Sequence, residues 1–218
     1  MYIGKKPTAA PLTSSDVADG IITNAKLAQD IISADTALGA EPADTDEFLV
    51  SDAGVLKRMD YSLIKGGGKV AQVVQATKTD TFTTTSTSFT DITGITVDIT
   101  PAASSSKILI IASIQIGGSS TVRQGLKLVR DSSDIHIGDA AGSRLRVTAA
   151  SNPHGANAVE SCNIVYLDSP STTSETTYKI QGNTESGNTL TINRGESDTD
   201  SNTRYRSASS ITVIEVSA

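Results

Sequence analysis

The chain has 218 residues, enough for one good-sized domain with an appendage or for two small domains. Its 18 Lys and Arg residues against 24 Asp and Glu residues give a net charge of −6, which excludes binding of nucleic acid or an anionic membrane through a broad basic surface. Aromatic residues make up 4% and Ser and Thr about a quarter of the chain, which is more typical of β-rich structural proteins than of enzymes with apolar substrate pockets.

Signals for secretion or membrane insertion are not apparent in the sequence. A single cysteine, Cys162, excludes an intramolecular disulfide framework. The first residues, MYIGKKPTAAPLTSSD, continue with Pro, Thr and Ser where a signal peptide would have an apolar segment. The longest apolar run, residues 108–116, has about half the roughly 20 residues of a membrane span and predicts a buried strand. We therefore expect a soluble protein that is made in the cytosol.

Residues 1–65 are predicted to form an extended attachment arm, and a glycine linker at residues 66–68 joins it to a head of residues 69–218. In the arm, Ile-Ile-Thr recurs about ten residues later as Ile-Ile-Ser, each copy followed by Ala and Leu. Such a segment is either a solvated tail or is ordered by neighbouring chains, and the spaced apolar residues favour the second. The predicted attachment residues are Ile21, Ile22, Leu27, Ile31, Ile32 and Leu38.

The end of the arm, residues 46–64, predicts a β-hairpin. The apolar segments FLV and VLKRMDY flank the turn former Asp52-Ala53-Gly54. Because an isolated two-stranded hairpin is marginally stable in water, we expect a partner surface to stabilise it.

After the glycines, apolar residues recur with a period of two, and no window of helical length has the 3.6-residue period. Turn formers separate the apolar segments. This pattern predicts an all-β head, a jelly roll or β-sandwich of two sheets. The predicted strands are residues 70–77, 81–90, 95–100, 107–116, 125–130, 133–137, 145–149, 159–167, 177–181, 190–193 and 210–216.

Two of these strands, with the sequences ILIIASIQI and CNIVYL, are apolar on both faces. An outer strand of a monomeric sandwich would carry polar residues at every second position. We therefore predict that residues 108–116, 162–167 or 211–216 contribute to a subunit interface of the head.

The sequence contains no nucleophile elbow, Walker loop or dinucleotide-binding turn. Cys162 has apolar neighbours, which favours a buried structural thiol. Residues 196–202 imitate the start of a calcium loop, but Thr203 occupies the position of the required glycine. His136 and His154 are either lone residues or, in a symmetric trimer, copies that meet on an axis and bind a metal ion; we favour the first. We expect no enzymatic activity, no metal site and no cofactor.

Two polar loops are the candidate binding sites. In residues 194–207, the triplet Arg-Tyr-Arg interrupts an acidic run, and both residue types are enriched at binding hot spots. In residues 152–157 (NPHGAN), amide groups are suited to sugar hydroxyls. The alternative is that both loops only cap the sandwich. The candidate residues are Asn152, His154, Arg204, Tyr205 and Arg206.

Five phrases are spread along most of the chain, between Asp19 and Val216: DGIITNAKLAQDII, EPADTDEFLVSDAGVLKRMDYSLIKG, LKLVRDSSDIHIGDAAGSR, SPSTTSETTYKIQ and SSITVIEV. These phrases resemble tail-fibre proteins of tailed bacteriophages, especially the short fibres of marine and cyanobacterial phages. They mark repeats, hairpins and strand edges and include no catalytic signature. The chain departs from the family in being short for a whole fibre and in lacking an obvious coiled-coil or β-helical shaft.

The resemblance implies a homotrimer that is synthesised in the host cytoplasm and resides in the virion. Its arm would attach to other tail or capsid proteins, and its head, similar to tumour-necrosis-factor-like trimers, would bind a glycan or protein on the host surface. The alternative is a virion structural, adaptor or capsid fibre protein without direct receptor binding. Neither nucleic acid nor a membrane is expected as a partner.

Overall fold

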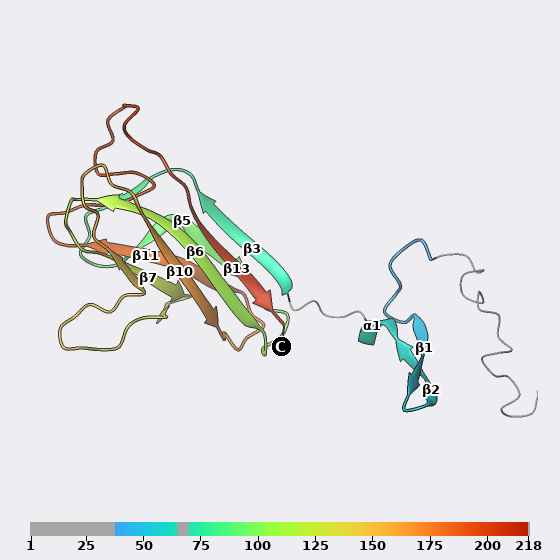
Figure 1. Ribbon diagram of the computed structural model, residues 1–218. Coiled ribbons are helices and arrows are strands. Elements are labelled where there is room, and N and C mark those ends of the chain that lie inside the picture. The colour runs from blue at the N-terminus through green and yellow to red at the C-terminus, as the bar shows by residue number, and fades with distance from the viewer. Residues whose placement is uncertain (1–37, 65–69, 218) are drawn as a thin grey trace, which may run out of the picture. The chain divides into compact units, whose positions relative to one another are not determined.

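The computed structural model describes residues 38–64 and 70–217. These residues belong to two units, which divide between Gly66 and Gly67. The first unit is a hairpin with one turn of helix, and the second is the head, built from antiparallel strands (Figure 1). The predicted all-β fold class is confirmed.

The first unit consists of β1 (Glu47–Asp52), β2 (Val55–Asp60) and α1 (Tyr61–Ile64). Ala53 and Gly54 form the turn between the strands with φ angles of 50° and 86°, as a two-residue turn that matches the strand twist requires. The rings of Phe48 and Tyr61 pack with their centroids 6.1 Å apart. The predicted hairpin is confirmed, and no side chain described in this unit is fully buried.

The head contains β3 (Val70–Lys78), β4 (Phe82–Thr84), β5 (Thr90–Ile99), β6 (Lys107–Gly118), β7 (Gln124–Arg130), β8 (Ser133–Ile135), β9 (Ala149–Ser151), β10 (Glu160–Asp168), β11 (Thr176–Thr184), β12 (Leu190–Ile192) and β13 (Ser209–Val216). One sheet has the order β3-β13-β6-β10, extended by β12 beside β6 and by β4 beside β12. The other has the order β5-β11-β7, with β8 and β9 both beside β7.

This pairing order is that of a jelly roll. The first long strand of the head pairs with the last, β3 with β13. The next pairs are β5 with β11 and β6 with β10, and β7 pairs with β8 and β9 at the centre. The head is therefore one long antiparallel hairpin folded into two facing sheets, as the sequence predicts.

Three predicted strands have wrong boundaries. The strand predicted at residues 95–100 begins five residues earlier, at Thr90, because Gly94 interrupts the alternation of apolar residues. In the other two, hydroxyl side chains compete for backbone hydrogen bonds. The strand predicted at residues 81–90 ends at Thr84, and Ser86 turns the chain by accepting from Ser88 N at 3.1 Å and donating to Ser88 O at 2.7 Å. The strand predicted at residues 145–149 begins only at Ala149. Just before it, Thr148 Oγ1 accepts the hydrogen bond of Leu128 N at 2.8 Å, in place of a backbone carbonyl.

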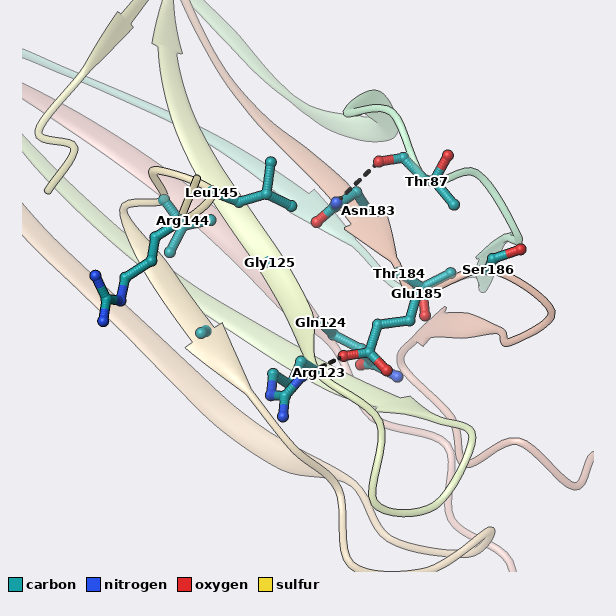
Figure 2. Close-up of a pocket in the computed structure, with 12 residues that line it drawn as sticks. Thr87, Arg123, Gln124, Gly125, Arg144, Leu145, Asn183, Thr184, Glu185 and Ser186 are labelled. Atoms are coloured by element: carbon teal, nitrogen blue, oxygen red, sulfur yellow. Dashed lines mark hydrogen bonds and ion pairs between the residues drawn. The ribbon is translucent and has the colours of Figure 1, made fainter. Parts of the chain in front are cut away.

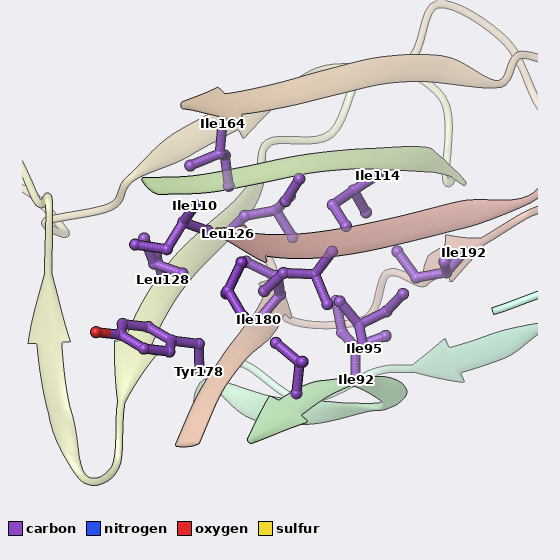
Figure 3. Packing of buried hydrophobic residues seen from close by; sticks show 14 of the residues in the cluster. Ile92, Ile95, Ile110, Ile114, Leu126, Leu128, Ile164, Tyr178, Ile180 and Ile192 are labelled. Atoms are coloured by element: carbon purple, nitrogen blue, oxygen red, sulfur yellow. The ribbon is translucent and has the colours of Figure 1, made fainter. Parts of the chain in front are cut away.

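The core lies between the two sheets and is rich in isoleucine (Figure 3). Strand β5 changes its register with β11 near Gly94, which has a φ of 82°. The irregularity changes which positions of the strand face the core. Ile92 and Ile95 on either side of Gly94 both point inward and are fully buried. Tyr178 is the one aromatic side chain among the fully buried described residues.

The sequence predicts that β6 is buried on both faces. Within a single chain, only the face toward the core is buried. Ile108, Ile110 and Ile114 are fully buried in the core. On the opposite face, Ile111 is 41% exposed, and the strand continues with partly exposed Ser113. The outer face of this sheet is therefore open in the isolated chain.

Candidate functional site

The head has two distinct ends. At one end, which we call the base, β3 begins at Val70 beside Val216 of β13, and Gln72 donates a 2.7 Å hydrogen bond to the carbonyl of Thr100. The opposite end, which we call the loop end, carries longer connections (Figure 1). Strand β6, with 12 residues, runs from the base to the loop end and spans roughly 36 Å at about 3.3 Å per residue.

Backbone hydrogen bonds hold the connections of the loop end side by side. Ser119 N donates to Thr189 O at 2.9 Å, and Thr121 N donates to Pro153 O at 2.8 Å. The two loops singled out in the sequence also meet, because Ser197 N donates to Ala156 O at 3.1 Å. The structure thus brings the loops of residues 152–157 and 194–207 together, through their backbones.

Asn193 holds the start of the loop of residues 194–207 through several hydrogen bonds. Its φ of 66° is one that asparagine tolerates better than most residues, and its side chain is fully buried. Nδ2 donates to the carbonyls of Lys78 and Asp80 at 2.9 and 2.8 Å. Oδ1 accepts from Ser209 Oγ at 2.6 Å, and the carbonyl accepts from Ser207 N at 3.1 Å. Asn193, just before the start of the loop, is therefore bonded to Ser207 and Ser209 at its end.

The loop encloses a hollow of about 270 Å³, which Arg204, Tyr205 and Arg206 line together with Asp198 and Asp200. Tyr205 is 71% exposed. Arg206 forms an ion pair with Asp198. Arg204 is partly buried and has no ion-pair partner in the described parts of the chain, so its charge is not balanced by a neighbouring carboxylate there.

The other predicted binding residues lie apart from this hollow. Asn152 is exposed, and His154 Nδ1 lies 3.6 Å from Glu160 Oε1. Among residues 38–64 and 70–217, no hydrogen bond or ion pair joins either side chain to the Arg-Tyr-Arg triplet. The five residues therefore occupy adjacent loops without forming one cluster.

A larger cavity, of about 660 Å³, opens at the loop end on the side of β7 and β11 (Figure 2). Its lining comes from the loop after β4, the start of β7, the segment around β9 and the end of β11. The side chains that carry its chemistry are Arg123, Gln124, Arg144, Asn183, Thr184 and Glu185. The sequence analysis missed this cavity, because its residues come from four separate segments and no local pattern connects them.

Three side chains that line the cavity, Gln124, Asn183 and Thr184, are more than nine-tenths buried. Asn183 Nδ2 donates to Thr87 O at 3.0 Å, as Figure 2 shows. Gln124 Nε2 donates to Thr189 O at 3.1 Å. The remaining oxygens of Gln124 and Thr184 have no hydrogen-bond partner within the described residues, which costs free energy in a buried site.

Gly125 gives the cavity its shape. A Cβ atom at this position would lie 2.6 Å from Asn183 Oδ1 and 2.9 Å from Val147 Cγ1. Any larger residue would push these two lining side chains away. The glycine therefore allows both to approach the backbone of β7.

The predicted attachment residues Ile21, Ile22, Leu27, Ile31 and Ile32 lie outside the described residues. Leu38, the sixth, is 68% exposed. In the hairpin, Leu49, Val55 and Leu63 are also mostly exposed. The described part of the arm thus presents apolar side chains to its surroundings.

Cys162 is half-buried, and burial raises the pKa of its thiol.

Within the described residues, no three His, Cys, Asp or Glu side chains are grouped so that they would hold a metal ion. In the same residues, no helix has the length and apolar character needed to cross a membrane.

No family model matches the chain, and no curated protein matches it. Among solved structures, it is similar to one described as the structure of infectious bursal disease virus, Gx strain, with 14% sequence identity and a TM-score of 0.34. The match covers 84% of this chain and 42% of that chain, so this chain spans less than half the length of the structure it matches.

Proposed function

We propose that this protein is a virion surface protein of the tail-fibre type, which attaches through its N-terminal arm and binds the host surface non-covalently with the loop end of its head. The observation that carries this proposal is that the two ends of the head differ. Strand β3, the first strand after the arm along the chain, begins at the base, and the loops with the hollow and the cavity lie at the opposite end of the strands. A base that faces the particle leaves the loop end free to meet a receptor.

The chemistry of the loop end suits binding rather than reaction. Tyr205 offers an exposed ring on which a sugar or an apolar side chain packs, and Arg204 adds a planar set of donors. The hydrogen bonds of Asn193 hold the loop in one conformation, which reduces the entropy lost on binding. Weak single-site binding is enough when several heads act together.

The open face of the first sheet supports a homotrimer as the assembly state. Its apolar part, which we call the sheet-face patch, consists of Val73, Ile214, Leu109 and Leu167 in one cross-strand row and Ile111 and Val165 in the next. Val165 and Leu167 are 62% and 53% exposed. Patches of this kind on soluble proteins mark interaction surfaces.

A second copy of the head is the occupant that fits the sheet-face patch. The rows that follow the patch toward the loop end carry Ser113, Asn163 and Ser210 in register, so this part of the face is uncharged. In a chain with a net charge of −6, an uncharged face lets copies approach with the least repulsion. We therefore assign the patch to the interface between copies in the trimer.

Sedimentation velocity of the full-length protein tests the assembly. The wild type is expected to be trimeric at micromolar concentration, and Val165→Lys is expected to shift it toward monomer, because the substitution places a charge in the interface. Ser133→Lys, on an exposed strand of the other sheet, is the matched control. A wild-type monomer, or a trimer that tolerates Val165→Lys, contradicts this assignment.

Adsorption of particles that carry variant protein tests the host-binding role. The double variant Arg204→Ala, Tyr205→Ala is expected to reduce adsorption while the oligomeric state and melting temperature stay unchanged. Glu175→Ala is the control, because this exposed residue precedes Thr176, which pairs with Ile99 at the base of the head. Normal adsorption with variants of both the hollow and the cavity indicates the alternative, a virion structural or adaptor protein without direct receptor binding.

A further inference from the structure

We propose that the cavity at the loop end binds a carboxylate-bearing sugar unit of a surface polysaccharide. The inference rests on the proposed host-binding role and names the ligand class that one part of the loop end takes. The volume of about 660 Å³ falls within the roughly 300–1,000 Å³ typical of small-ligand sites.

The charged side chains of the cavity favour an anionic ligand. Arg123 Nη1 pairs with Glu185 Oε1 at 2.9 Å, so these two charges balance each other. Arg144 Nη1 donates to the carbonyl of Ala141 at 3.2 Å and has no carboxylate partner in the described part of the chain. One guanidinium is therefore uncompensated at the cavity of an otherwise acidic protein, and its planar fork matches a carboxylate.

The buried polar side chains call for hydroxyl groups on the same ligand. Gln124 Oε1 accepts hydrogen bonds only, and it has no donor within the described residues. Thr184 Oγ1 also has no hydrogen-bond partner among the residues that the structure describes. Neighbouring atoms cover both oxygens in this structure, so a ligand would bond them only after a change of rotamer of the two side chains. A bare inorganic anion brings few donors, whereas a sugar acid brings several hydroxyl groups beside its carboxylate.

Another part of the cavity lining is apolar. Leu145, which is 70% exposed, lines the cavity (Figure 2). Val147 and Ala150 also belong to the lining. A pyranose ring has an apolar C–H face as well as hydroxyl edges, so it packs against such a wall while its edges meet polar groups. A cation, two buried oxygens without partners and an aliphatic wall together fit a sugar acid better than a neutral sugar or a small anion.

Calorimetric titration of the full-length protein with methyl glucuronide tests this inference, with methyl glucoside and inorganic phosphate as comparison ligands. We expect saturable glucuronide binding in the millimolar range, about tenfold tighter than glucoside, as one added charged contact predicts. Phosphate should bind more weakly than glucuronide, because it leaves the apolar wall uncovered. Glucoside that binds as well as glucuronide, phosphate that binds as well, or no saturation up to about 50 mM overturns the proposal.

The variants Arg144→Gln and Arg146→Gln form a matched pair. Arg144 lines the cavity, whereas Arg146 bonds the carbonyl of Gly138 and is not among the lining residues. Arg144→Gln should weaken glucuronide binding about tenfold and leave the melting temperature unchanged, and Arg146→Gln should leave both unchanged. Equal effects of the two variants, or none from Arg144→Gln, contradict the assignment.

This titration is independent of the adsorption assay. Glucuronide binding without any role in adsorption would uphold the cavity and contradict the proposed function. If adsorption depends on Tyr205 but no sugar acid binds at the cavity, the proposed function is upheld and the ligand assignment of the cavity is contradicted.

Discussion

The hydroxyl of Tyr178 donates a 2.7 Å hydrogen bond to the carboxylate of Asp168, and both side chains are buried in the head. Arg130 Nη1 lies 3.0 and 2.8 Å from the two oxygens of the same carboxylate. Burial, reinforced by the hydrogen bond to Asp168, raises the pKa of Tyr178 far above its ordinary value, so the phenol stays a donor. Because Asp168 belongs to one sheet and its two partners to the other, this trio ties the sheets together.

Tyr178→Phe is expected to destabilise the head by about 1.5–3 kcal/mol, because it removes a buried hydrogen bond to a charged group. For a domain of this size that is a fall in melting temperature of roughly 4–10 °C, measurable by circular dichroism. Tyr205→Phe removes the same hydroxyl from an exposed ring and should leave the melting temperature within about 1 °C. A melting temperature that is unchanged in Tyr178→Phe would show that the trio does not hold the sheets.

Glu215 makes the stability of the head depend on pH. It is fully buried; Gln72 Nε2 donates to Oε2 at 2.6 Å, and Ala102 N donates to Oε1 at 2.8 Å. Burial by itself would raise the pKa of this carboxyl, but hydrogen bonds from Ser106, Gln72 and the backbone lower it below its ordinary value of 4.5. The ionised form is therefore the one that the folded head stabilises.

Since the folded-state pKa of Glu215 is depressed, its contribution is complete above about pH 4.5 and is lost as the pH falls through the depressed value. Glu215→Gln should lower the free energy of unfolding by roughly 1.5–3 kcal/mol at pH 7. The gap to wild type should narrow in acid, as urea titrations at pH 7 and at pH about 3.5 would measure. Glu175→Gln, at an exposed position, controls for the loss of one negative charge. A gap that does not change with pH would rule out this role.

Asn193→Ala is expected to cost about 3 kcal/mol, because three hydrogen bonds of a buried side chain are lost and alanine is strained at a positive φ. Asn193→Gly loses the same hydrogen bonds without that strain, so it should be about 1 kcal/mol less destabilising than the alanine variant. Urea denaturation of both variants, with exposed Asn202→Ala as a control, measures the two contributions separately. Equal losses in the alanine and glycine variants would mean that the backbone conformation contributes nothing.

Gly117→Ala should prevent close packing at the root of the loops. Its Cβ atom would lie 2.1 Å from the carbonyl of Arg194 and 2.9 Å from that of Ala158, both on backbone that cannot easily move. We expect a loss of more than about 3 kcal/mol or a failure to fold, as limited proteolysis and thermal melting would show. Gly138→Ala, where nothing lies within 4 Å of the new atom, should stay within about 0.5 kcal/mol of wild type. A stable Gly117→Ala protein would contradict the backbone packing described here.

Much of the fold can be read from the period of the sequence, because alternating apolar residues specify strands with one face inward. The alternation at Val97 and Ile99 and the turn at Asp52-Ala53-Gly54 predict their elements correctly. The sequence also identifies the loop of Tyr205, since a polar segment between strands has to lie at the surface. The predicted strand boundaries are wrong where Ser86 and Thr148 use their hydroxyls in place of backbone partners. The partner of Ser86 is local, whereas that of Thr148, Leu128, lies 20 residues away along the chain.

Only the tertiary structure decided which faces and which side chains come together. A period of two says that Ile110 and Ile111 point in opposite directions, but not that the second faces solvent beside Val165. Nor does it reveal the cavity, whose uncompensated Arg144 and buried Gln124 come from segments that meet because β9 pairs with the start of β7. Strand patterning is a local property of the chain, whereas a site depends on which distant segments the jelly-roll pairing places side by side.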